Sequence, residues 1–124
     1  MKIKTDFVTN SSSSSFVVMG ANLDPATIPD KFIIKLQTEC DIDYSIEDIR
    51  DDMNEYINVL IKGTDLKTAV GYEYEGYIMI GIEYTDMGGD ETLNQFKQRV
   101  KKQILDATGV EVEPGHIEDC WMDN

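Results

Sequence analysis

Five carboxylates gather on one predicted helix and form the strongest candidate binding surface in the sequence. They are Glu47, Asp48, Asp51, Asp52 and Glu55. On an α-helix this spacing places them in two adjacent columns of one face, within about 12 Å of helix axis. One charge per about 2.4 Å is comparable to the one phosphate per roughly 3.4 Å of a DNA strand. The pattern indicates a surface that imitates a phosphate backbone and occupies a basic site on a nucleic-acid-binding protein, or else the solvated face of a helix in an acidic protein.

A predicted hairpin of residues 69–74 and 77–84 supplies a second candidate surface. A two-residue turn at 75–76, with Gly at its second position, would place Tyr72 opposite Met79. Four side chains then share one face of the hairpin: Tyr72, Tyr74, Tyr77 and Met79. If uncovered, this face is a stacking or protein-binding platform, and a partly solvated structural face is the alternative.

Residues that could support catalysis or metal binding are sparse. His116 is the single histidine, and Cys120 lies four positions after it with two acids between them. A zinc or iron site needs three or four ligands in a defined geometry, so we expect no metal and no cofactor. The acidic segment 86–91 lacks the spacing of a calcium-binding loop, and the serine run 11–15 has no neighbouring base. We therefore expect that the protein is not an enzyme.

Hydrophobic periodicity predicts the elements that carry these residues. In the N-terminal part we expect a strand at 2–8, a serine-rich loop at 9–15 and a strand at 16–19 ended by Gly20. Residues 31–40 form a helix or, less favourably, a strand, and residues 46–61 form a helix capped by Ser45. The hairpin follows, and after it we expect a helix capped by Asp90 and ended by Gly109, and a strand at 110–113. This order predicts an α+β fold, with two or three helices packed on one face of a mainly antiparallel sheet. We expect a single domain over residues 1–124.

Composition argues against several classes of function. The 124 residues contain 24 Asp and Glu against 11 Lys and Arg, which gives a formal net charge of −13. Such a chain binds nucleic acid or an anionic membrane poorly because like charges repel, and no apolar run approaches the roughly 20 residues of a membrane span. Cys40 and Cys120 are too few for a disulfide framework, and no apolar segment follows Lys2 and Lys4 as in a signal peptide. We therefore expect reduced thiols and a cytoplasmic location.

The two ends of the chain resemble those of a known group of proteins. The opening MKIKTDFVTNSSSSSFVV is similar to the signature MKIRTDFVTNSSSSSF of small proteins from Firmicutes and their phages, with Lys4 in place of Arg. The ending HIEDCW resembles the acidic, Trp-containing ending of some of them. The resemblance implies a phage or mobile-element origin. It does not point to a particular activity or to particular catalytic residues.

These observations lead to one hypothesis and two alternatives. We expect a small acidic phage or prophage accessory protein that uses the five carboxylates to bind a basic surface on a host or phage protein. The first alternative is an oligomeric phage structural or assembly protein that associates through the tyrosine face. The second is a small enzyme or modification target that uses the serine run or His116.

Overall fold

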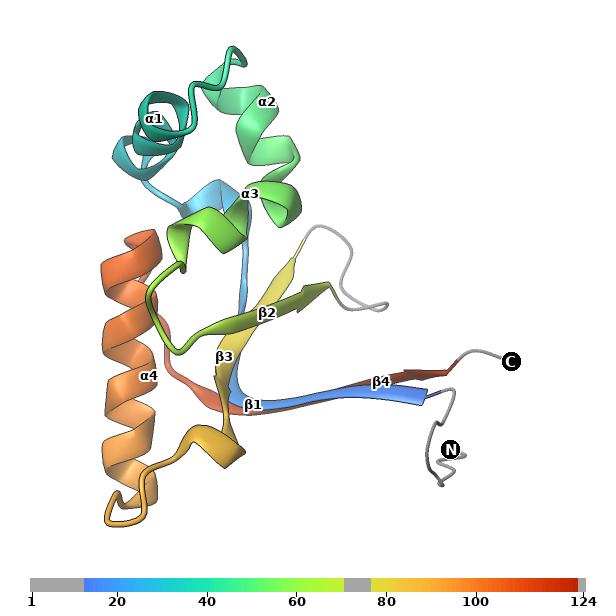
Figure 1. Ribbon diagram of the computed structural model, residues 1–124, viewed down its shortest axis with the longest axis vertical. Coiled ribbons are helices and arrows are strands. Elements are labelled where there is room, and N and C mark those ends of the chain that lie inside the picture. Colours follow the sequence, from blue (N-terminus) through green and yellow to red (C-terminus); the bar gives the residue numbers. More distant parts are fainter. Residues whose placement is uncertain (1–12, 71–76, 123–124) are drawn as a thin grey trace.

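The computed structural model describes residues 13–70 and 77–122, which form a four-stranded antiparallel sheet and a set of helices (Figure 1). The strands are β1 (Ser13–Leu23), β2 (Lys67–Val70), β3 (Ile78–Glu83) and β4 (Gly115–Met122), in the spatial order β2-β3-β1-β4. The helices are α1 (Asp30–Glu39), α2 (Ile46–Asp51), α3 (Met53–Leu60) and α4 (Leu93–Thr108), with short 3-10 turns η1 (Pro25–Thr27) and η2 (Tyr84–Asp86). The predicted α+β fold is confirmed.

The helices pack on one face of the sheet. Alternate residues of β1 and β3 point to this face, because successive side chains of a strand point to opposite sides. Met19, Leu23, Ile78, Ile80 and Ile82 form one buried cluster with apolar side chains of all four helices. The helical members of that cluster are Ile33, Leu36, Ile49, Met53, Ile57, Phe96, Val100, Ile104 and Ala107.

The opposite face of the sheet carries a small second cluster. Val18 and Met79 are buried there against the partly buried Ala69 and Ile117. Between Val18 and Met79 lies the pair Gly20 and Gly81, which are directly opposite each other in the register of β1 and β3. Strand β1 curves strongly along its length (Figure 1). The absence of side chains at the glycine pair lets the backbones of β1 and β3 approach closely.

The first described strand differs from its prediction at both ends. Ser13–Leu23 is continuous, so Ser13 to Ser15 belong to β1 and not to a loop, and Gly20 does not end the strand. The three serines pair with Cys120 to Met122 of β4, which gives their backbone groups partners that a loop would lack. The predicted strand at 2–8 and the remainder of the predicted loop, 9–12, lie outside the described residues.

The helical predictions hold with one important correction. α1 is a helix as predicted, and Ser45 caps α2 by accepting a hydrogen bond from the Asp48 N–H at 3.1 Å. The predicted helix at 46–61 is instead two helices that meet at Asp52, where φ is −108° and ψ is 27°. Aspartate is a weak helix former, and the like charges at i,i+4 lower helix stability further. The helix therefore breaks within its most acidic stretch.

The C-terminal third also differs from the prediction. α4 is capped by Thr92 in a capping box with Gln95, and not by Asp90. Its end at Gly109 is confirmed, with φ of 76° in the left-handed region. Residues 110–113 are not a strand; they run beside α4, where Lys101 binds Glu113 at 2.8 Å. The last strand is β4, in the segment that we expected to be only a tail.

Candidate functional site

The acidic corner, defined as Glu47, Asp48, Asp51, Asp52 and Glu55, lies where α2 meets α3. The Ser45 cap starts α2 so that Glu47 and Asp48 lie in its first turn, and Glu55 lies in the first turn of α3. All five side chains are exposed. Ile49, Met53 and Ile57, on the other side of the same helices, are at most 1% exposed and anchor the corner in the core.

The corner is bent and does not form one straight row of charges. Asp52 ends α2 and precedes α3, and the two helices run in different directions (Figure 1). The Asp52 N–H donates to the carbonyls of both Asp48 and Ile49 at 3.2 Å, as is common in a terminal turn. The predicted regular spacing along a single helix axis is therefore wrong, although the same five carboxylates remain neighbours along the chain.

Arg50 is the only basic residue in this stretch, and its guanidinium points away from the acidic corner. Its Nη1 donates to the carbonyls of Pro25 and Ile28 at 2.7 Å each, and its Nη2 binds Asp30 Oδ1 at 2.6 Å. The side chain is 19% exposed. Arg50 thus joins α2 to the start of α1 and leaves the carboxylates of the corner without its charge.

The acidic corner, together with Glu39, Asp41 and Asp43 just before it, holds much of the negative charge of the protein. Residues 39–55 contain eight acids and one base, so they account for seven of the thirteen net negative charges. Within the described parts of the chain, none of the five corner carboxylates forms an ion pair. Partial burial raises the pKa of Tyr56, and the negative charges of Tyr44, Glu55 and Asp52 raise this pKa further. The corner therefore presents uncompensated carboxylates to solvent and favours a cationic partner.

The tyrosine face has a different register from the one predicted. Met79 lies opposite Ala69 and not opposite Tyr72, and it is only 3% exposed because it packs with Val18. The antiparallel pairing of β2 with β3 is confirmed; β2 begins two residues earlier than predicted, and β3 is one residue shorter at each end. Tyr77 is 42% exposed, while Tyr72, Tyr74 and the predicted turn lie outside the described residues. Met79 therefore does not contribute to an exposed aromatic face.

His116 belongs to a chain of polar contacts on the helix-covered face of the sheet. Its Nδ1 lies 2.9 Å from the Tyr84 hydroxyl, and its Nε2 lies 3.3 Å from Glu118 Oε1. The Tyr84 ring packs between His116 and Phe96, and this burial raises the pKa of the Tyr84 hydroxyl. Among the described residues no three His, Cys, Asp or Glu side chains converge as metal ligands would. The nearby Cys120 is paired in β4 opposite Ser15, and the structure describes its backbone alone.

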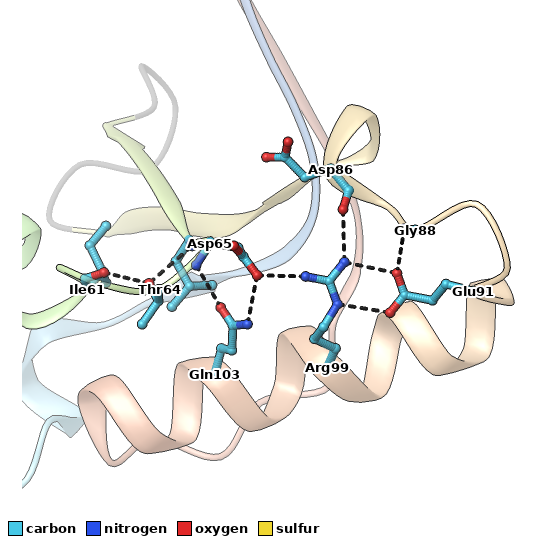
Figure 2. A network of polar contacts seen from close by, with 9 residues as sticks. Ile61, Thr64, Asp65, Asp86, Gly88, Glu91, Arg99 and Gln103 are labelled. Atoms are coloured by element: carbon cyan, nitrogen blue, oxygen red, sulfur yellow. Dashed lines mark hydrogen bonds and ion pairs between the residues drawn. The ribbon is translucent and has the colours of Figure 1, made fainter.

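Arg99 forms a network of polar contacts that includes Asp86 and Glu91 of the acidic segment 86–91 (Figure 2). Arg99 binds both oxygens of Glu91 at 2.9 Å, Asp65 Oδ2 at 2.8 Å and the Asp86 carbonyl at 3.0 Å. Gln103 also binds Asp65 Oδ2, at 3.0 Å. The bond from Arg99, and a second from the Gly88 N–H, hold the pKa of Glu91 below its usual range. Sequence spacing gave no sign of this network, because its partners come from three separate segments.

Comparisons with protein-family models, with curated proteins and with solved structures found no match to this chain. In the part of the chain that the structure describes, no helix combines the length and apolarity that crossing a membrane requires. The exposed carboxylates of the acidic corner are suited to electrostatic binding.

Proposed function

We propose that the chain is a small, non-catalytic accessory protein of a phage or prophage, and that its acidic corner binds a basic surface on a host or phage protein. The single observation that carries this proposal is the orientation of Arg50. The one cation of the acidic stretch is held by backbone carbonyls and Asp30, so the exposed carboxylates have no internal counterion there. Such a surface gains most from a partner that supplies the missing positive charge.

The rigidity of the corner also supports binding. Three core side chains hold α2 and α3 in place, the Ser45 cap fixes the start of α2, and Arg50 ties its last turn to the carbonyls of Pro25 and Ile28. A surface that is already ordered loses less conformational entropy when it binds. Because of the bend at Asp52, the basic partner must contact two short helices.

Assembly through the tyrosine face has weaker support. Its member Met79 is buried, and Tyr77 is the only one of its four side chains that the structure describes as exposed. We therefore keep the acidic corner as the proposed binding surface. A basic site on a nucleic-acid-binding protein is the partner chemistry that it fits best, since such a site already accepts closely spaced negative charges.

The test is affinity capture from the lysate of a Firmicute host, followed by titration of the captured protein. We compare the wild type with Asp51→Lys/Asp52→Lys, which reverses two charges in the corner. The matched control is Asp90→Lys/Glu111→Lys, which changes the net charge equally at two exposed acids outside it. We expect the wild type to capture a basic, nucleic-acid-binding protein. This protein should be released at about 0.5 M salt, where exposed charge pairs are screened.

The corner variant should lose at least about tenfold in affinity, because two attractive contacts become repulsive. The control variant should retain nearly all of the wild-type affinity. Equal affinity of the corner variant and the wild type for the captured protein would show that binding uses another surface. Equal losses in both variants would show that net charge matters and that the corner does not.

A further inference from the structure

Strand β4 forms one edge of the sheet and has an apolar hollow beside it. Among the described strands, β4 pairs only with β1, so its outer backbone edge has no partner. At its start lies a hollow of about 450 Å³ lined by Met19, Leu93, Asn94, Lys97, Pro114 and Gly115. Leu93 is 57% exposed at this site. An open strand edge next to an apolar hollow is a recurring arrangement for docking an extended chain.

The far half of β4 also lacks support from the rest of the sheet. β3 pairs with β1 only from Val18 to Leu23, so Ser13 to Val17 pair with β4 alone in the described structure. This two-stranded ribbon extends away from the helices (Figure 1). A two-stranded ribbon is marginally stable in water, whereas a third or fourth strand stabilises it.

The residue order along β4 is complementary to itself. His116 and Glu118 are two positions apart, so they lie on the same face, and their side chains are 56% and 62% exposed. If two β4 strands pair antiparallel about Ile117, His116 of each copy lies opposite Glu118 of the other. In this register the contact of 3.3 Å between His116 Nε2 and Glu118 Oε1 within each copy is exchanged for two imidazole–carboxylate pairs between the copies. The register also avoids placing Glu118 opposite itself, which would be destabilising. It also brings the backbone of Cys120 of the second copy opposite Pro114, which lines the hollow.

We propose that the outer edge of β4 is a self-association surface, on which a second copy of this chain pairs edge to edge about Ile117. The two copies then share one continuous sheet, and the same patch of each contacts the other, as a two-fold dimer requires. This inference is independent of the acidic corner. α3 packs beside β2, at the opposite edge of the sheet, so the acidic corner remains exposed in the dimer (Figure 1).

The test is sedimentation velocity of the full chain over a concentration series, compared among four proteins. We expect a reversible dimer for the wild type and at least about tenfold weaker association for Glu118→Lys, which places Lys opposite His116 twice. The double variant His116→Glu/Glu118→Lys restores opposite charges across the interface and should recover most of the affinity. Tyr77→Ala is the matched control because Tyr77 is exposed outside β4, and it should dimerise like the wild type.

Two results would overturn this inference. One is a wild-type chain that stays monomeric at every concentration up to about 1 mM, a range that reveals even weak association. The other is a dimer that Glu118→Lys leaves unchanged, which would place the contact on another surface. Circular dichroism of each variant confirms that a lost dimer does not reflect a lost fold, and amide hydrogen exchange should show new protection along β4 on dimerisation.

Discussion

Gly20 of β1 lies directly opposite Gly81 of β3, and their backbones approach more closely than any side chain would allow. A Cβ on Gly20 would lie 2.7 Å from the Gly81 Cα, and a Cβ on Gly81 would lie 2.7 Å from Val18 Cγ2 and 2.8 Å from the Gly20 Cα. These neighbours are mostly backbone atoms, which cannot rotate away. The pair therefore lets the backbones of β1 and β3 approach closely, and it lets Val18 and Met79 meet on the far face of the sheet.

Gly81→Ala should destabilise the protein strongly. The added methyl group must displace the backbone of β1 or the buried Val18, which we expect to lower the free energy of unfolding by about 2–4 kcal/mol. Urea denaturation followed by circular dichroism measures the change. Gly89→Ala is the control, because nothing lies within 4 Å of a Cβ at that position. Similar stability of the two variants would contradict the close approach.

Arg50→Gln should loosen the acidic corner. The substitution removes two bonds to backbone carbonyls and one to Asp30, and we expect a loss of about 2 kcal/mol in the free energy of unfolding. Asp30→Asn should cost less than about 1 kcal/mol, because the Asp30 side chain is 70% exposed and surface ion pairs contribute little. Equal losses would mean that the ion pair, and not the carbonyl contacts, holds Arg50. Denaturant titration of both variants measures the difference.

Glu91 should make stability depend on pH in the acid range. Its pKa is lower in the folded protein than in the unfolded chain, so its contribution is fully present above the ordinary carboxyl pKa of about 4.3. The contribution decreases as the pH falls below that value through the folded pKa. Glu91→Gln should therefore reduce the slope of stability against pH below about pH 4.3. Thermal melts between pH 3 and pH 7 measure this slope, with Asp43→Asn, at an exposed carboxyl, as the control.

Thr92→Ala should weaken the start of α4. The Thr92 hydroxyl accepts a hydrogen bond from the Gln95 N–H at 3.1 Å, and the Gln95 side chain accepts one from the Thr92 N–H at 2.9 Å. Loss of such an N-cap costs about 1 kcal/mol. Thr85→Ala, at an exposed threonine of η2, should leave the unfolding midpoint nearly unchanged. An equal effect of the two substitutions would argue against the capping box.

The elements with a strong apolar period could be predicted from the sequence. Phe96, Val100 and Ile104 are spaced four residues apart, and all three are fully buried in α4. Ile78, Ile80 and Ile82 alternate, and they point together into the core from β3. In these segments local periodicity and tertiary packing favour the same structure, so the class of fold followed from them.

The elements that depend on distant partners could not be predicted in this way. β4 has no alternating apolar pattern, and its pairing with β1 joins Ser13 to Met122 across nearly the whole chain. The direction of Arg50 depends on contacts with residues 25–30, which the spacing of the acids does not encode. The composition of the acidic corner was therefore predictable, whereas its bend and its missing counterion were not.

The position of the acidic corner also has a consequence for how the molecule approaches a partner. With more than half of its net charge in residues 39–55, the protein has an uneven charge distribution and therefore an electric dipole. In the field of a cationic surface such a dipole turns the molecule until the acidic corner leads, before any contact forms. Encounters are then oriented in advance, and their rate falls as added salt shortens the range of the field.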